Sequence, residues 1–217
     1  MPRRAEAAVE RGPVVLPAWV PGPAQAIALV VALLFLAGVV GYAIGRPKHP
    51  RTNDADIGFL EDMTAHHEQA IAMSFTFLQN AGSDDPLLVH TAQGIVRVQS
   101  AEIRVMNELL QDWDEDGDPD VAMEWMDQPV AQNAMPGLAT SSDLRLLDTA
   151  TGRVAEELYS RLIIRHHQGG ADMAEAAADL AASGEVRELA SKMAKSQRAE
   201  ILELETRRRD LGFAPLE

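Results

Sequence analysis

Apolar residues recur at steps of three and four in two stretches of the chain, whose motifs coincide when the sequence is shifted by 100 positions. The first stripe consists of Phe59, Met63, His66, Ala70, Met73 and Phe77, and the second of Tyr159, Ile163, His166, Gly170, Met173 and Ala177. This spacing is typical of a helix that buries one face. The pattern predicts two long helices, each with a histidine midway along its buried stripe.

A second pair of stretches shares the pattern Gln-x-x-Glu, in "QSAEIRVM" (99–106) and "QRAEILEL" (197–204). Their predicted buried stripes are Ile95, Val98, Glu102, Met106 and Leu109 in the first, and Met193, Ser196, Glu200 and Leu204 in the second. Gly82 and Gly184 are predicted to end the preceding helices. The repeat therefore predicts an all-α domain, a four-helix bundle built from two duplicated helical hairpins.

This predicted domain occupies residues 57–217, with an acidic insert at 111–140 between the hairpins. A short helix is expected from about Ser142 to Ala150, started by Thr140 or Ser141 and stopped by Gly152. Residues 46–56 are polar, contain two prolines and are predicted to form a linker. The proline-rich residues 1–23 are predicted to form a disordered tail.

The stretch 24–44, "AQAIALVVALLFLAGVVGYAI", carries no charged residue. About 20 apolar residues span a bilayer as a helix, so we expect a transmembrane anchor within 24–45. The alternative is a cleaved signal peptide, with Ala43 and Gly45 as the small-residue pair. The length of the apolar run and of the segment before it favours the anchor. Three basic residues precede the run and three follow it, so charge does not set its orientation.

Composition removes several classes of function. The formal net charge of −14 argues against nucleic-acid binding, which requires clustered lysine and arginine. The chain has no cysteine, so disulfides, thiolate metal sites, thiol catalysis and a lipid-carrying cysteine are excluded. The sequence shows no nucleophile triad or phosphate-binding loop, and we expect a protein that is not an enzyme. The sequence does not indicate an oligomeric state.

Four of the six histidines form two adjacent pairs, His66-His67 and His166-His167. The first of each pair lies on the buried stripe, and the second is expected about 100° round the helix, at its flank. A glutamate lies in the middle of each Gln-x-x-Glu stripe. A buried carboxylate is costly unless it is paired, protonated or bound to a metal.

These residues predict a metal site, because histidine is the commonest metal ligand in proteins. Imidazole suits zinc, copper, iron or nickel, and a methionine thioether selects copper, especially Cu(I). The candidate ligands are Met63, His66, His67, Met73, Glu102, His166, His167, Met173 and Glu200. Copper is the expected ion, with zinc or iron as alternatives.

Two other interpretations remain open for the same residues. The methionines can be core filler, and the two core histidines, His66 and His166, can be buried imidazoles that bond to Glu102 and Glu200 in a structural or partner-binding bundle. A di-metal oxidase is a minor alternative, because such bundles use Glu-x-x-His motifs and this chain has none.

The acidic insert begins like a calcium-binding loop. The pattern D-x-D-x-D-G places candidate ligands at Asp112, Asp114, Asp116 and Asp118. Position twelve of such a loop is normally a glutamate, whereas here it is Met123. A solvated acidic linker is therefore the alternative to a calcium site.

The motifs "FLEDMTAHHEQAIAM", "QSAEI", "MPG" and "LIIRHHQGGADMAEAA" resemble the bacterial domain of unknown function three hundred and five, over about 57–213. The resemblance implies a ferritin-like fold in an exported or membrane-anchored protein, and the family includes periplasmic copper-binding members linked to copper tolerance. It places both histidine pairs, Met73 and Met173 at signature positions. Gly169-Gly170, which replaces Gln69-Ala70 in the second copy, and the acidic insert depart from the family pattern.

The resulting hypothesis is a single-pass protein of the bacterial cytoplasmic membrane. Residues 24–44 would hold it in the membrane, and its C-terminal domain would bind copper on the extracytoplasmic side.

Overall fold

The computed structural model describes residues 34–38, 52–113 and 121–216. The chain divides into two units, 1–48 and 49–217. Residues 34–38 are helical, whereas the predicted tail and the rest of the predicted anchor at 24–44 lie outside the described residues. Within the described ranges, no helix is long and apolar enough to cross a membrane.

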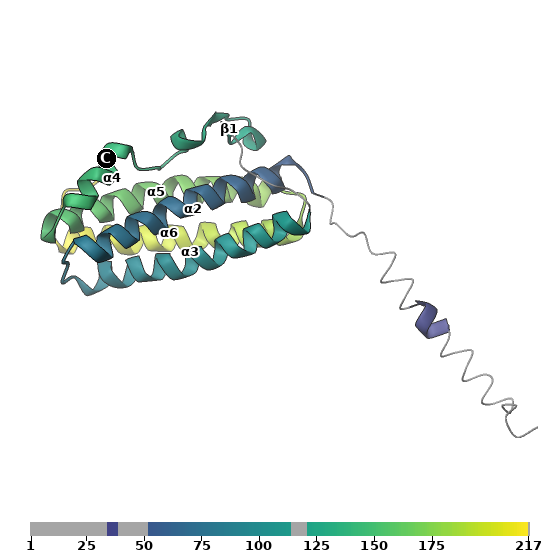
Figure 1. The fold of residues 1–217 in the computed structure, drawn as a ribbon, viewed down its shortest axis with the longest axis horizontal. Coiled ribbons are helices and arrows are strands. Elements are labelled where there is room, and N and C mark those ends of the chain that lie inside the picture. The colour runs from purple at the N-terminus through teal and green to yellow at the C-terminus, as the bar shows by residue number, and fades with distance from the viewer. Residues whose placement is uncertain (1–33, 39–51, 114–120, 217) are drawn as a thin grey trace, which may run out of the picture. The chain divides into compact units, whose positions relative to one another are not determined.

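The second unit is mostly helical, as predicted for an all-α protein. Its long helices are α2 (Asp54–Asn80), α3 (Pro86–Asp112), α5 (Gly152–Leu180) and α6 (Gly184–Asp210). Helix α2 packs against α3 and α5, and α6 packs against α5 and contacts α3. Figure 1 shows the four helices side by side.

The helix boundaries follow from local capping. Helix α2 begins at Asp54, three residues before the predicted start of the domain at 57. A capping box sets this start: the side chain of Asn53 accepts a hydrogen bond from the backbone N–H of Asp56, and the Asp56 carboxylate accepts one from the backbone N–H of Asn53. Gly82 lies in the turn after α2 with a φ of +56°. Gly184 was predicted to end a helix, and this prediction is wrong. Helix α5 already ends at Leu180, and Gly184 is the first residue of α6.

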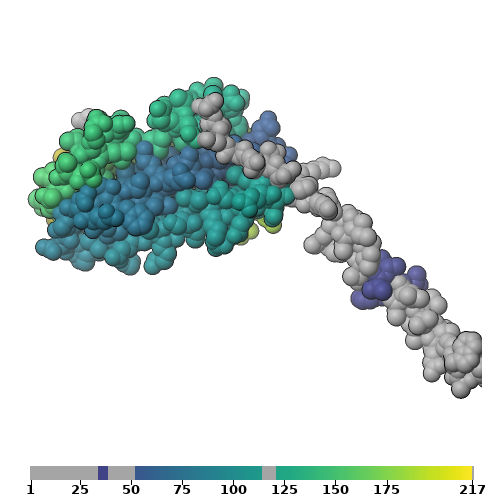
Figure 2. All heavy atoms as spheres, viewed as in Figure 1, coloured from purple at the N-terminus to yellow at the C-terminus, as the bar shows by residue number. Residues whose placement is uncertain are grey.

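The segment between the hairpins is more structured than predicted. It contains β1 (Val121–Ala122), η1 (Glu124–Met126), β2 (Val130–Ala131), η2 (Gln132–Ala134) and α4 (Ser141–Thr149). The strands pair antiparallel, and the sequence pattern did not indicate them. The predicted short helix is confirmed as α4, started by a capping box between Thr140 and Asp143. Both η1 and α4 contact α2, and Figure 2 shows this covering segment (121–149) on the outside of the long helices.

Hydrogen bonds at the helix ends join the two hairpins. The buried carboxylate of Asp56, near the start of α2, accepts bonds of 3.1 and 2.9 Å from the backbone N–H groups of Ala182 and Ser183 in the α5–α6 turn. The N–H of Gly152, at the start of α5, donates to the carbonyl of Ala81 in the α2–α3 turn at 2.6 Å. Each turn therefore lies beside the start of the other hairpin, and α2 and α5 run antiparallel.

The core consists of two apolar clusters at different levels along the helices. One contains the later part of the α2 stripe and the early part of α5, where Phe77 stacks on Tyr159 with ring centroids 4.2 Å apart. The other contains the early part of α2 and the later part of α5, with Phe59 and Met173. Both predicted stripes on α2 and α5 are buried throughout. The histidines lie between the two clusters.

Two glycines, Gly137 and Gly169, allow the loop after η2 to contact α5 closely, and Gly170 makes room for side chains of α2 and α6. A Cβ on Gly169 would lie 2.0 Å from the carbonyl oxygen of Pro136, and a Cβ on Gly137 would lie 2.5 Å from the carbonyl oxygen of Arg165. Gly137 also has a φ of +85°, which favours glycine. A Cβ on Gly170 would lie 3.1 Å from Cε1 of His66. The Gly169-Gly170 departure from the first copy therefore makes room for the loop and for α2.

Replacing Gly169 with alanine should destabilise the protein, because the added carbon would meet rigid backbone at Pro136. We expect Gly169→Ala to lower the free energy of unfolding by about 1–3 kcal/mol. Gly94→Ala is the matched control, because that helix-interior glycine has nothing within 4 Å of the added Cβ. The control should gain about 0.5–1 kcal/mol. Urea unfolding followed by circular dichroism measures both, and equal stability of Gly169→Ala and the parent would contradict the close contact.

Candidate metal centre

The first histidines of the two pairs meet at the centre of the domain. The ring centroids of His66 and His166 are 3.8 Å apart, with an angle of 38° between the ring planes. Both residues are buried, at 0% and 1% exposure, as predicted from their positions on the stripes. The antiparallel packing of α2 and α5 brings the middle of each helix to the same level.

The second histidines lie about 100° round each helix from the first, at the flanks, and both flanks are buried. His67 and His167 are both 0% exposed. Each is covered by the other helix of its own hairpin, α3 for His67 and α6 for His167. The flank of one helix is therefore the interface with the next, and all four imidazoles are in the interior.

The pairing of histidines with glutamates also differs from the prediction. Nε2 of His67 lies 2.8 Å from a carboxylate oxygen of Glu102, and Nε2 of His167 lies 2.6 Å from one of Glu200. The prediction assigned these glutamates to His66 and His166. The glutamate side chains are 20% and 29% exposed, so they lie at the edge of the core and not in it. That position lowers the cost of holding an ionised carboxylate.

His66 and His166 use backbone carbonyls instead. Nε2 of His66 donates to the carbonyl oxygen of Pro136 at 3.1 Å, and Nε2 of His166 donates to the carbonyl oxygen of His66 at 2.9 Å. A carbonyl only accepts hydrogen bonds, so Nε2 carries the proton in both rings and Nδ1 has a free lone pair. Pro136 was not predicted as a partner of His66, although its "MPG" motif was among the segments that carried the family resemblance.

Two glutamines belong to the same polar layer. Gln99 and Gln197 are each 4% exposed, whereas Val98 and Ser196, which were predicted to be buried, are exposed. The predicted stripes of α3 and α6 were therefore wrong by one residue at this level, whereas Ile95, Met106, Met193 and Leu204 are buried as predicted. The recurring Gln-x-x-Glu pattern was the signal for both glutamines, since they occupy equivalent positions in the two hairpins.

The glutamines and glutamates surround a small cavity between α3 and α6. Its volume is about 10 Å³, and Gln99, Glu102, Gln197 and Glu200 are among its lining residues. This is close to the minimum space for one water molecule. The side-chain oxygens of both glutamines have no hydrogen-bond partner within the described part of the chain. The cavity therefore lies between the glutamate edge of the layer and buried amide oxygens that can accept a hydrogen bond or a cation.

The three methionines proposed as ligands are all buried. Met63 and Met173 belong to one core cluster and Met73 to the other, on opposite sides of the histidine layer. The cluster that holds Met63 and Met173 contains four further methionines, namely Met106, Met123, Met135 and Met193. The region is therefore rich in thioethers, and these side chains fill the core.

Burial keeps the central imidazoles neutral. Desolvation, the largest cause, lowers the pKa of His66 to about 3 and outweighs the bond to Pro136, and the neighbouring histidines lower it further. Desolvation and the other three imidazoles lower the pKa of His166 well below its ordinary value. A neutral imidazole with an unprotonated nitrogen is the form that binds metals. Nδ1 of all four histidines is buried without a hydrogen-bond partner among the described residues.

The chemistry of the layer fits a metal ion, but a coordination shell is not formed. A ligating histidine commonly donates its other ring N–H to a carboxylate, as His67 and His167 do here. However, no group of three or more histidine, aspartate or glutamate side chains in the described ranges is arranged to hold an ion.

The possible calcium loop is only partly described. Asp112 is the last residue of α3. Asp114, Asp116 and Asp118 lie outside the described residues. The calcium hypothesis therefore stays a prediction.

The lowered histidine pKa values predict loss of stability in mild acid. The unfolded chain takes up protons near pH 6.5 while buried His66 does not until about pH 3, so acidification favours unfolding. We expect the free energy of unfolding to fall by roughly 1 kcal/mol for each such histidine between about pH 6.5 and 5.5. Urea titrations across this range measure the slope. His66→Asn should flatten it, whereas His90→Gln, which removes an exposed histidine on α3, should not. A pH-independent free energy would contradict the burial of neutral imidazoles.

Comparisons with known proteins identify a family and several solved structures of similar fold. The family described as Domain of unknown function (DUF305) matches residues 56–208. No curated protein matches the chain. A solved DUF305 structure from Streptomyces coelicolor, described as a secreted protein, is 31% identical, with a TM-score of 0.69, and the alignment covers 75% of this chain and 97% of that one. A DUF305 fragment from Deinococcus radiodurans is 28% identical, with a TM-score of 0.61 and coverages of 72% and 97%.

CopM is a third structural relative. Its Cu(II)-bound form is 29% identical to this chain, with a TM-score of 0.59, and the alignment covers 72% of this chain and 97% of CopM. CopM has also been solved with Cu(I) and with silver bound. The family match spans well over half of the sequence and includes both histidine pairs, and so this protein belongs to the DUF305 family.

Proposed function

We propose that the helical domain binds copper through its buried histidine layer. One observation carries the proposal: four imidazoles lie buried at one level of the core, each with an Nδ1 that has no partner among the described residues. A bare nitrogen in the interior loses its bond to water and gains nothing in return. A metal ion would supply the missing interaction.

The choice of copper rests on the donors and on one relative. Imidazole and thioether together favour copper over harder ions, and Cu(I) in particular. Buried methionines lie on both sides of the layer. CopM, a relative of similar fold, has been solved with Cu(I), Cu(II) and silver. Zinc and iron remain alternatives, because imidazole alone accepts them as well.

The glutamate pairs would orient the ligands. Glu102 and Glu200 accept bonds from Nε2 of His67 and His167, which fixes the ring orientation and makes Nδ1 the more basic nitrogen. Both carboxylates are partly exposed beside the small cavity between α3 and α6. We propose that a cation enters past these two side chains.

A structural role is the second candidate, and a specific observation favours it. Nε2 of every histidine in the layer already has a partner, namely Glu102, Glu200 or a backbone carbonyl. Such a layer can set the register of the helices without any ion. Metal titration separates the two candidates.

We also propose that the domain binds without catalysing a reaction. Oxygen-activating di-iron bundles carry four glutamates and two histidines in their core, with the histidines in Glu-x-x-His motifs. Here the layer has two glutamates, both at its edge, and four histidines. The carboxylates are too few for that chemistry.

The setting of the domain is a further part of the proposal. The four long helices would form a ferritin-like bundle made by duplication of one hairpin. Residues 24–44 would anchor the chain in the cytoplasmic membrane, with the domain on the extracytoplasmic side. The uncharged apolar run and a relative described as secreted support this placement.

Copper binding should depend on the buried layer and not on histidine content. The full chain, equilibrated with Cu(I) or Cu(II) and dialysed, should retain a stoichiometric amount of copper. The double variant His67→Gln/His167→Gln should lose it, because two ligands disappear. Glu102→Gln should lower the affinity about 10–100-fold by removing the orienting carboxylate. Elemental analysis and competition with a chelator measure both effects.

The matched control is His90→Gln, which removes an exposed histidine outside the layer. It should bind like the parent. Copper content that is negligible in the parent, or equally reduced in His90→Gln, would leave the structural role as the better explanation. Thermal melts of the metal-free variants show whether the layer is needed for folding.

Iron oxidation distinguishes binding from catalysis. The full chain should not increase the rate at which Fe(II) is consumed in aerated buffer, because the layer lacks a di-iron carboxylate set. Oxygen uptake and Fe(III) absorbance measure this rate, with Glu102→Ala as the comparison. Sustained turnover that disappears in Glu102→Ala would contradict the proposal.

A further inference from the structure

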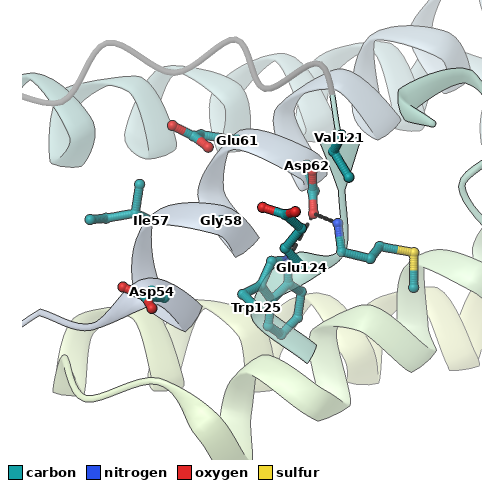
Figure 3. A pocket seen from close by; sticks show the side chains of 9 residues that line it. Asp54, Ile57, Gly58, Glu61, Asp62, Val121, Glu124 and Trp125 are labelled. Atoms are coloured by element: carbon teal, nitrogen blue, oxygen red, sulfur yellow. Dashed lines mark hydrogen bonds between the residues drawn. The ribbon is translucent and has the colours of Figure 1, made fainter. Parts of the chain in front are cut away.

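A pocket that contains no histidine lies beside the first two turns of α2. It is formed between α2 and residues 121–125 and has a volume of about 270 Å³. Figure 3 shows its walls: Asp54, Ile57, Glu61 and Asp62 come from α2, and Glu124 and Trp125 come from the covering segment. Four of its lining side chains are acidic and none is basic.

The pocket has a fixed wall. One oxygen of Asp62, Oδ2, accepts hydrogen bonds from the backbone N–H of Met123 at 2.8 Å and from the indole N–H of Trp125 at 2.7 Å. The indole lies directly on Gly58, where a Cβ would be 2.4 Å from Cδ1 of Trp125. The ring of Phe59 packs edge-on against the same indole, with the ring centroids 6.0 Å apart. The tryptophan is therefore held in place by α2 before any ligand arrives.

The other oxygen of Asp62 carries the inference. Asp62 is 1% exposed, yet its Oδ1 atom has no hydrogen-bond partner among the described residues. A buried carboxylate oxygen without a partner is costly. A positively charged group in the adjoining pocket would remove that cost.

The form of the pocket selects the kind of cation. Beside its four acidic side chains, the pocket has apolar walls from Ile57, Val121 and Trp125. Carboxylates combined with an aromatic and aliphatic wall suit an organic cation, whose charge is attracted by both the acids and the ring face.

We propose that this pocket binds a primary ammonium group carried on a short aliphatic stem. The ammonium donates to Oδ1 of Asp62 and lies near the carboxylates of Glu124 and Asp54, and the stem lies against Ile57 and Trp125. An ammonium has three donors in a compact head, which matches one buried oxygen with further acceptors around it. A free alkylamine and a lysine side chain of another protein present the same chemistry.

Calorimetric titration of the full chain tests the proposal with three probes: n-butylammonium chloride, an acetylated and amidated Gly-Lys-Gly peptide, and calcium chloride. We expect butylammonium or the peptide to bind, and calcium not to bind at this pocket. Binding of butylammonium alone identifies a small amine as the ligand. Binding of the peptide alone identifies a protein lysine.

Charge-neutral variants locate the site. Glu124→Gln changes an exposed side chain and should weaken amine binding about tenfold, the effect of losing one charge-assisted contact. Asp62→Asn should abolish binding, and its circular dichroism spectrum shows whether it folds. Asp127→Asn is the matched control, because it removes one charge from the same segment at a residue that does not line the pocket. Asp127 has a left-handed backbone conformation, which asparagine also tolerates.

Three results would overturn the proposal. The first is that neither amine binds. The second is that Asp127→Asn weakens amine binding as much as Glu124→Gln does, which would indicate attraction to the net negative charge alone. The third is calcium binding that is lost in Glu124→Gln, which would make the pocket a metal site.

Discussion

The fold depends on a layer of polar side chains that crosses the whole core. Four imidazoles and two glutamines are buried at the same level, between two apolar clusters that would otherwise be continuous. Such a layer is tolerated only if its groups remain neutral and most of their polar atoms have partners. The lowered pKa values of His66 and His166 meet the first condition, and bonds to carboxylates and carbonyls meet much of the second. The bonds from His67 to Glu102 and from His167 to Glu200 join the helices within each hairpin, and the bond from His166 to the carbonyl of His66 joins the two hairpins. A shift of any of these helices along its axis would break at least one of these bonds.

The repeat in the sequence predicted much of this arrangement. The four long helices, the short α4 and the burial of His66 and His166 follow from periodicity and capping residues, which are local properties of the chain. The pairing of each second histidine with the glutamate of its own hairpin did not follow. Neighbouring residues on a helix point about 100° apart, so an error of one residue in a predicted stripe changes which side chain is buried. For this reason Val98 and Ser196 were predicted to be buried in place of Gln99 and Gln197.

The remaining errors arose where distant segments meet. The contact of Pro136 with His66 joins residues 70 positions apart, and no local pattern reports it. The Asp62 pocket depends on Met123 and Trp125, in a segment whose acidic beginning suggested only a linker or a calcium loop. Met123 and Asp127 adopt left-handed conformations without being glycine, so the turn between β1 and β2 has no obvious sequence signature. Tertiary contacts hold these residues in conformations that their side chains do not favour.

The helical hairpin occurs twice in the domain, whereas the covering segment (121–149) between the two hairpins occurs once. A single hairpin with one histidine pair would have an unpaired polar face and would be complete only as a symmetric homodimer, with His66 facing its own copy across a twofold axis. In such a dimer both halves would be identical. Joining the hairpins in one chain removes that requirement, and the connection between them can then make different contacts with each half. Here the carbonyl of Pro136 accepts a hydrogen bond from His66, while His166 bonds to the backbone of α2. The two histidine pairs can therefore have different surroundings, which a symmetric dimer would not permit.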